Sequence, residues 1–218
     1  MATQRHFFPF SLPCAISFLA VTCLGNELAQ AHFVVTTWET DQGLPENSAT
    51  SMVQDEQGFL WFGTANGLVR FDGIHFEVFD RTKLPALPSP AIVNLHLDQA
   101  GRFWVSTRQG LIVRDGGRWL RCDSGLGWEG TEVRHFSNGP DGIVSLATND
   151  GHLLQFIGNR FNPVPPPPGT QQESHFIHTD SKSRLWALDS EFFGYWKDGS
   201  WNGSHHLNQR RIAAEVLP

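Results

Sequence analysis

The sequence predicts an all-β fold made of β-propeller blades, four-stranded antiparallel repeats of about 42 residues, forming a partial propeller. The first observation is a phrase that occurs in full at 55–73 and 98–116 and in fainter form at 142–158 and 180–199. The second is its spacing of 43, 42 and 41 residues between the glycines that end the copies: Gly73, Gly116, Gly158 and Gly199. The third is strand-type content in each copy. Strand content repeated at a fixed period of forty-odd residues is typical of propeller blades.

The first 31 residues are expected to be a secretory signal peptide that lies outside the fold. Arg5 precedes a mostly apolar stretch at 7–24, and Ala29-Gln-Ala31 places small residues at the −3 and −1 positions of a cleavage site. The mature chain would then start at His32. An uncleaved membrane anchor is the alternative, but the stretch is short for a span and contains prolines. Lipid attachment at Cys23 is disfavoured by the large residue before it.

Charge and cysteine content narrow the class of protein. Without Arg5 and Glu27, the region after the signal keeps 15 basic and 21 acidic residues, a net charge of −6. An acidic chain with no basic run is a poor binder of nucleic acid, and no later stretch is long and apolar enough to span a membrane. Cys122 is the one cysteine after residue 31, so no internal disulfide is expected. These features predict an exported protein, periplasmic or extracellular.

The region 32–218 divides into four expected blades, at about 48–80, 91–122, 132–163 and 174–206. In the first blade, the predicted strands are 49–55, 59–63, 68–71 and 76–79. Glycines recur in the two hairpin turns of each unit, where Asn-Gly and Asp-Gly pairs supply the positive φ that a tight turn needs. We therefore expect a backbone role for the glycines of the turn before the third strand, Gly67, Gly110 and Gly151, and for those of the turn after it, Gly73, Gly116, Gly158 and Gly199.

Aromatic residues recur at fixed strand positions. The second strand carries Trp61, Trp104 and Trp186, with Ser145 at this position in the third copy. Tryptophans at a repeated strand position are expected to fill the space between adjacent blades, and an aromatic platform for a sugar is the alternative. The outer strands are expected to place further structural aromatics, and the inner strands an apolar ladder of core type formed by Met52, Leu95, Phe136 and Ile177.

The two ends of the chain carry incomplete repeats. Residues 33–38 have the register of an outer strand without the three strands that should precede it, and 211–216 could begin a fifth blade. This pattern predicts that the chain is the front part of a larger propeller protein. The alternative is a closed ring of four blades with a loose N-terminal arm. An open array would leave unpaired strand edges.

The first repeat and its lead-in resemble the two-component regulator propeller family. The residues that carry the resemblance are Thr37-Trp-Glu-Thr-Asp-Gln-Gly-Leu-Pro-Glu-Asn47 and Gly58-Phe-Leu-Trp-Phe-Gly-Thr64. The match weakens along the chain, since Pro90 stands where Asn47 would recur. The resemblance implies the periplasmic sensor half of a signalling protein, in which a membrane helix and a histidine kinase or diguanylate cyclase follow the propeller.

The same resemblance implies the function that we expect of the chain. Several relatives sense breakdown products of polysaccharides, so a small ligand, with an oligosaccharide as the first candidate, is the expected partner. A homodimer with a second sensor is compatible with this role. No cofactor, metal or catalytic residue is expected in these 218 residues.

Loops at one end of the blades are the expected ligand site, because propellers bind at the face made by the second-to-third strand turns and the connections between blades. Arg108 and Trp128 are the first candidates, through charge-assisted contacts and stacking. The other candidates in these loops are Asn66, Glu129, Asn149 and Asp150, with Glu46 and Gln171 on the connections. The alternative is that these are merely polar residues of exposed loops.

Histidines and prolines offer weaker candidates. His96 and His178 share an inner-strand position two blades apart, and His135 lies close in phase, but a repeat does not guarantee that they converge on a metal. A polar channel lining is the simpler interpretation, and His205-His206 is similarly weak. The run at 163–168 is expected to be a stiff connection between blades and not a docking motif.

Two other classes of function remain open from the sequence. A secreted propeller enzyme, such as a lyase or glycosidase, would need clustered acids or a His, Tyr and Arg set, and Tyr195 is the single tyrosine. A protein-binding scaffold that uses its blade faces is the other alternative. The sequence favours the sensor.

Overall fold

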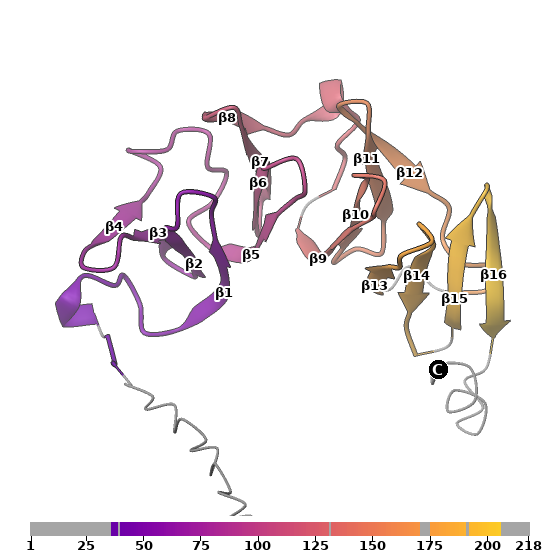
Figure 1. Cartoon of the computed structure of the whole chain (residues 1–218), viewed down its shortest axis with the longest axis horizontal. Helices are drawn as coiled ribbons and strands as arrows, with labels where there is room; N and C mark the ends of the chain where they lie inside the picture. Colours follow the sequence, from indigo (N-terminus) through magenta and orange to yellow (C-terminus); the bar gives the residue numbers. More distant parts are fainter. Residues whose placement is uncertain (1–35, 39, 131, 171–174, 191, 206–218) are drawn as a thin grey trace, which may run out of the picture. The chain divides into compact units, whose positions relative to one another are not determined.

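The computed structural model describes residues 36–38, 40–130, 132–170, 175–190 and 192–205 (Figure 1). The chain divides into two units, 1–36 and 37–218, and all the secondary structure described below belongs to the second. The predicted signal peptide at 1–31 and the fifth-blade start at 211–216 lie outside the described residues.

Within the described residues, strands form four sheets, each of four strands in the order of the chain (Figure 1). The first sheet consists of β1 (Ala49–Gln54), β2 (Leu60–Thr64), β3 (Gly67–Phe71) and β4 (Phe76–Phe79). The second consists of β5 (Ile92–Leu97), β6 (Phe103–Thr107), β7 (Gly110–Asp115) and β8 (Arg118–Arg121). The third consists of β9 (Val133–Asn138), β10 (Val144–Thr148), β11 (Leu153–Ile157) and β12 (Arg160–Val164). The fourth consists of β13 (Phe176–Thr179), β14 (Leu185–Leu188), β15 (Phe192–Lys197) and β16 (Ser200–His205).

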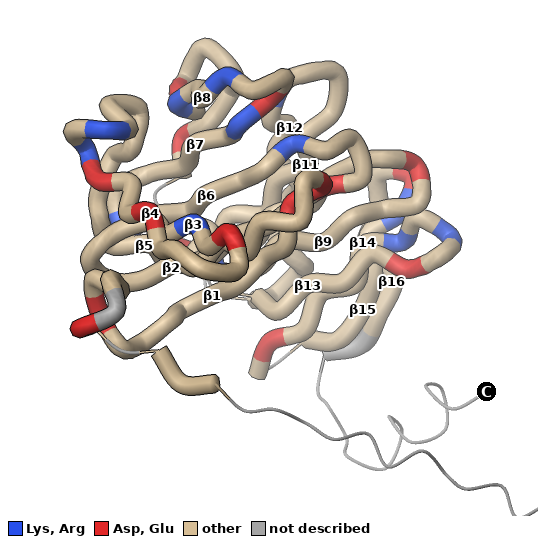
Figure 2. The backbone as a smooth tube through the Cα atoms, turned by 60° about the vertical axis from the view of Figure 1, so that its left-hand side comes forward, with Lys and Arg blue, Asp and Glu red and all other residues tan. Residues whose placement is uncertain are grey.

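Every pairing inside these sheets is antiparallel, and the all-β fold of propeller-type blades is confirmed. The strands predicted for the first blade agree with the structure to within one residue at each end. Two short 3-10 helices, η1 (Thr40–Gln42) and η2 (Ser124–Leu126), lie in the connections. Charged residues lie mainly in turns and connections, while the strand interiors are largely uncharged (Figure 2).

The turn between the second and third strands has the same construction in the first two sheets. The Thr64 hydroxyl donates to the Gly67 carbonyl at 2.9 Å and accepts from the Asn66 amide at 3.1 Å. Thr107 makes the equivalent bond to the Gly110 carbonyl at 2.9 Å. Gly67 and Gly110 have φ of 152° and 144°, values that side chains rarely adopt, so the recurrence of glycine has a backbone cause.

An aspartate carboxylate accepts a hydrogen bond from the tryptophan of the second strand in three sheets, and this contact was not predicted from the sequence. The indole nitrogen of Trp61 donates to Asp55 Oδ2 at 2.8 Å, and that of Trp104 donates to Asp98 Oδ2 at 2.8 Å. Trp186 makes the same bond to Asp180 at 2.9 Å. The aspartate lies six residues before the tryptophan each time, so the repeated phrase encodes a hydrogen bond as well as a turn.

The third sheet lacks both members of this pair. Ser145 stands at the tryptophan position, and six residues earlier Gly139 replaces the aspartate. A buried carboxylate without its donor would be costly, because an unsatisfied buried polar group loses its hydration without compensation. The joint absence of the two residues is therefore physically consistent.

The core lies between successive sheets. Trp61 packs against Phe103 and Trp119 of the second sheet, with ring centroids 5.2 and 6.2 Å apart. Trp104 packs against Phe156 and Phe161 of the third sheet, at 5.0 and 5.9 Å. The third and fourth sheets share a smaller apolar cluster. Each sheet thus buries one face against the next, as propeller blades do.

First strands of neighbouring sheets also lie in contact, β1 with β5, β5 with β9, and β9 with β13. Among the described residues, no such contact set joins the first and fourth sheets, so the structure gives no support to a closed ring of four blades. Trp186 of the fourth sheet is accordingly half-buried, whereas Trp61 and Trp104 are buried.

Two expectations need correction. Met52 is not a core residue, because 61% of its surface is exposed, whereas Leu95 and Ile177 are buried. Its side of the first sheet has no preceding sheet among the described residues.

In the expected outer strand at 33–38, residues 33–35 lie outside the described residues and 36–38 are not in a strand. Trp38 instead packs its ring on Phe71, with centroids 5.1 Å apart.

Candidate ligand-binding site

The alternation of strand directions places the loops at two ends of the sheets. The end that holds the second-to-third strand turns, at 64–67, 107–110 and 148–153, together with the connections between sheets, is named the connection end. The opposite end, which holds the first-to-second and third-to-fourth strand turns, is named the turn end. The Arg108 amide donates to the Ala91 carbonyl at 3.1 Å, and the Asn149 amide to the Glu132 carbonyl at 2.9 Å. These bonds tie each turn to the connection that precedes its sheet.

A cavity of about 290 Å³ lies between the connection 122–132 and strands β11 and β12 of the third sheet. Its polar lining comes from Glu129 on the connection, His152 at the start of β11, and Arg160 and Asn162 on β12. Leu154 and Phe161 provide apolar walls. The cavity therefore offers a carboxylate, an imidazole, a guanidinium and an amide around one space.

The backbone beside the cavity is shaped by a short helical turn. Asp123 begins η2 and its carboxylate accepts the Gly125 amide at 2.9 Å, while Gly127 ends the turn with φ of 78°. A Cβ at Gly127 would lie 2.6 Å from the Phe161 carbonyl, so the connection can approach β12 this closely only with glycine. The connection is thus held against the sheet at the position where it presents Glu129.

Asp150 and His152 form a small charged cluster at the edge of the cavity. Asp150 accepts a short hydrogen bond from the Thr148 hydroxyl and lies 3.2 Å from His152 Nδ1. Partial burial acts to raise the pKa of Asp150, but the bonds from Thr148 and His152 outweigh it and hold that pKa below its usual value. The carboxylate is ionised at neutral pH and orients the imidazole.

The structure distributes the predicted site residues among several places. Asn66, Arg108, Asn149 and Asp150 are exposed in second-to-third strand turns, and Glu129 is exposed in the cavity wall. Asp150 reaches the cavity through His152, whereas Asn66 and Arg108 belong to the turns of other sheets. The Glu46 carboxylate accepts the Ala65 amide at 3.0 Å, and Gln171 lies outside the described residues.

Trp128 lies in the core and not on the surface. Its exposed fraction is 5%, and its ring packs on Phe161 with centroids 5.1 Å apart. In this conformation the ring is not offered to a ligand for stacking. Its physical role is to anchor the connection on the third sheet.

Three cavity residues were missed by the sequence reasoning: His152, Arg160 and Asn162. Arg160 and Asn162 lie on an outer strand, whose recurring residues were interpreted as structural. The one signal that could have pointed to His152 is the Asp150-x-His152 spacing in a turn, which places a carboxylate and an imidazole side by side.

The inner-strand histidines make local contacts. His96 pairs with Trp104 across the sheet and His178 with Trp186, so their register is equivalent. His96 Nε2 lies 2.8 Å from the Asn138 amide oxygen, and its ring stacks on Phe136 at 4.9 Å. Within the described part of the chain, no group of three or more His, Cys, Asp or Glu side chains is placed to hold a metal ion. In that same part, no helix is both long and apolar enough to cross a membrane.

Comparisons with known proteins find a match to one family model over a short segment, a curated relative and several similar folds. Residues 43–66 match the two component regulator propeller family. A segment of 76 residues is 33% identical to histidine kinase P4 of Formosa agariphila, covering 35% of this chain and 5% of that protein. The chain thus spans a small part of that relative's length.

Among solved structures, two extracellular domains of B. thetaiotaomicron signalling proteins are similar to this chain. The first, from a hybrid two-component system, has 20% identity and a TM-score of 0.59 over 70% of this chain and 22% of its own. The second, from a one-component system, has 18% identity and a TM-score of 0.56, and the match covers 76% of this chain and 23% of that chain. Virginiamycin B lyase from Staphylococcus aureus has 13% identity and a TM-score of 0.57, and the match covers 73% of this chain and 56% of that chain. At these identities the likeness establishes the fold alone.

Proposed function

We propose that this chain, in which residues 43–66 match the two component regulator propeller family, is the ligand-sensing region of a signalling protein outside the cytoplasm. The segment similar to histidine kinase P4 and the fold shared with extracellular domains of signalling proteins support this assignment. The chain acts by binding and carries no catalytic step of its own. A histidine kinase or diguanylate cyclase elsewhere in the parent protein supplies the output.

The same proposal covers the organisation of the chain. Residues 1–31 act as a signal peptide and 32–218 as the sensor region, with blades at about 48–80, 91–122, 132–163 and 174–206. Export places the sensor in the periplasm or outside the cell. Pairing of two sensors in a homodimer would give binding a way to change the distance or angle between two output domains.

The observation that carries the binding proposal is the cavity beside the third sheet. Its four polar side chains supply both hydrogen-bond donors and acceptors, and its volume of about 290 Å³ suits a small ligand. Such a mixed lining matches the alternating hydroxyl donors and acceptors of a sugar. Arg160 adds a guanidinium, which favours a sugar that carries a carboxylate or sulfate. We therefore propose an oligosaccharide as the ligand class.

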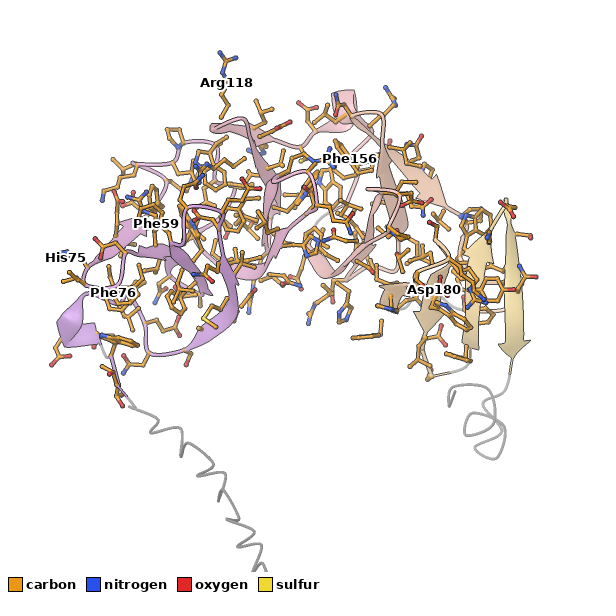
Figure 3. The ribbon with its side chains drawn as sticks, viewed as in Figure 1. Phe59, His75, Phe76, Arg118, Phe156 and Asp180 are labelled. Carbon is orange, nitrogen blue, oxygen red and sulfur yellow. The ribbon has the colours of Figure 1, made fainter. Side chains whose placement is uncertain are left out.

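A glycan array probed with the purified protein tests the proposal, followed by titration calorimetry of the strongest glycan. Arg160→Ala and Glu129→Gln should each weaken binding by roughly tenfold, the loss typical of one charge-assisted hydrogen bond. Arg118→Ala is the matched control, since Arg118 starts the equivalent outer strand of the second sheet and projects away from the sheets (Figure 3). Its affinity should be unchanged.

Two further variants separate the candidate loops. Arg108→Ala tests the neighbouring turn, where a loss of binding with Arg160→Ala unaffected would move the site to the turns of the second sheet. Trp128→Ala would open the core, so its effect on binding has no bearing on stacking. Release of a cleaved product from the bound glycan would overturn the non-catalytic assignment.

A further inference from the structure

Asp55, Asp98 and Asp180, which precede the second strands of the first, second and fourth sheets, share one hydrogen-bond pattern. Asp55 Oδ1 accepts the amides of Gln57 and Phe59, both at 3.0 Å. Asp98 Oδ1 accepts two amides at the same positions, at 3.0 and 2.9 Å, and Asp180 Oδ1 does so at 2.9 and 3.0 Å. In all three, Oδ2 accepts the indole of the strand tryptophan.

One bond distinguishes Asp55 from the other two. Arg102 Nε donates to Asp98 Oδ2 at 2.6 Å, and Arg184 Nε donates to Asp180 Oδ2 at 2.6 Å. Both arginines lie four residues after the aspartate, and that position in the first sheet is Phe59. Asp55 Oδ2 therefore has one charge-assisted bond fewer than its counterparts, although the exposed fraction of its side chain is only 5%.

A cavity of about 480 Å³ occupies the space beside Asp55, at the turn end between the first and second sheets. It lies at the opposite end of the sheets from the turns predicted to bind ligand. Between the second and third sheets, the guanidinium of Arg102 lies over the Phe156 ring at 4.7 Å. Between the first and second sheets no arginine follows Asp55 to take that place, and the space is open.

Charges around this cavity favour a cation. Asp55, Glu56 and Asp115 contribute three carboxylates, against one guanidinium from Arg114. Arg114 Nη1 is 3.9 Å from Asp55 Oδ2, too far for a hydrogen bond. Arg70, on β3 of the first sheet, pairs with Glu77 at 2.7 Å and stacks on Phe59 at 4.5 Å. Neither arginine replaces the missing bond.

We propose that this cavity binds a small ligand through a guanidinium or alkylammonium group, which donates to Asp55 Oδ2 as Arg102 and Arg184 donate to their aspartates. Glu56 and Asp115 at the cavity wall complement the positive charge, and a volume of about 480 Å³ is within the range of small-molecule sites. The site is separate from the sugar cavity beside the third sheet. A sensor with two sites could respond to a basic and a saccharide ligand independently.

Titration calorimetry of the purified chain with agmatine, whose guanidinium and ammonium are both charged, tests the proposal. Butylurea, a neutral analogue of the guanidinium end, serves as the ligand control and should not bind. Glu56→Gln with Asp115→Asn removes two exposed carboxylates without touching the core and should weaken agmatine binding by roughly tenfold or more.

Two further variants act on Asp55 itself. Phe59→Arg with Arg70→Val reproduces the arrangement of the second sheet, where the corresponding residues are Arg102 and Val113, and should abolish binding while the chain stays folded by circular dichroism. Asp55→Asn should also abolish it, whereas the matched Asp180→Asn, in a sheet that does not line the cavity, should leave the affinity unchanged. If Asp55→Asn fails to fold, the Phe59→Arg, Arg70→Val variant still decides the question.

Three results would overturn the proposal. The first is no binding of agmatine, arginine or putrescine up to about 10 mM, which would mean that Arg114 neutralises Asp55 without help. The second is equal binding of agmatine and butylurea, which would remove the role of charge. The third is unchanged agmatine binding after Phe59→Arg with Arg70→Val.

Discussion

Removal of the Asp98 carboxylate is the sharpest test of how the repeated phrase holds a blade together. This side chain is 1% exposed and accepts four hydrogen bonds, from two turn amides, from Arg102 at 2.6 Å and from the Trp104 indole at 2.8 Å. The variant Asp98→Ala leaves the indole N–H of Trp104 without an acceptor in a fully buried position, because the exposed fraction of Trp104 is 0%. Arg102 loses its partner at the same time.

The expected loss follows from these contacts. An orphaned buried donor costs about 1–3 kcal/mol, and breaking a buried charge pair by removing one partner costs about 3–5 kcal/mol. Arg102 retains 14% exposure and can reach water in part, which reduces its share. We expect Asp98→Ala to lower the free energy of unfolding by about 3–5 kcal/mol. Asp115→Ala, at the exposed end of β7 in the same sheet, should change it by about 0.5 kcal/mol or less.

Equilibrium urea unfolding followed by circular dichroism measures these free energies. A double-mutant cycle with Trp104 then shows how much of the loss belongs to the hydrogen bond between Asp98 and Trp104. Trp104→Phe keeps much of the ring packing but removes the donor, so Asp98→Ala should cost less in that background than in the native one. The coupling energy should be about 1–3 kcal/mol. Strict additivity of the two changes, or a loss below about 1 kcal/mol for Asp98→Ala, would refute the assignment of this bond as the determinant of the phrase.

Three further outcomes follow from the structure. Cys122 should not react with a thiol reagent at about pH 8 until the chain unfolds, because burial raises the pKa of its thiol to about 12; labelling of the native chain would contradict this. Burial lowers the pKa of His96 despite its hydrogen bond with Asn138, so the unfolded chain binds the proton more readily and stability should fall as pH drops below about 6.5. Urea melts at about pH 7 and pH 5 measure this decrease in the free energy of unfolding, which should be smaller for His96→Gln than for the native chain. Some decrease should remain in the variant because the pKa of His135 is also lowered. An equal decrease in both proteins would exclude His96 as the cause. Gly110→Ala should cost about 1–3 kcal/mol, since φ is 144° there and a Cβ would touch Pro88, and an unchanged unfolding midpoint would show that the turn relaxes freely.

The repeat could be predicted from sequence because its turns and spacing are local. Asn66-Gly67 and the terminal glycines, which recur every 41 to 43 residues, place the hairpins, and with them the strand limits of the first sheet follow to within one residue. Each of these features depends on backbone conformation over a few residues. A single sequence carries that information directly.

The side-chain contacts could not be obtained in the same way. Asp55 and Trp61 were each noticed as parts of the phrase, yet their hydrogen bond depends on the depth and direction of two side chains, one in the turn after β1 and one on β2. The burial of Trp128 depends on how closely the connection approaches β12, which Gly127 decides. Met52 shows the opposite case, an apolar residue at a core position of the repeat that has no neighbouring sheet to cover it.

The candidate site was anticipated at the level of loops and not of side chains. Glu129 and the turn at Asn149-Asp150 were predicted and lie at or beside the cavity, but Arg160 and Asn162 reach it from a strand that looked structural. A cavity forms where three separate segments meet, so its lining follows from their packing and not from any one motif. Only the three-dimensional arrangement selects these residues.

A crystal structure of the chain with its strongest glycan ligand would test the central claim most directly. The account predicts an intact glycan in the cavity beside the third sheet, in contact with Arg160 and Glu129. A hydrolysed or eliminated product in the crystal, or a glycan bound far from this cavity, would contradict it.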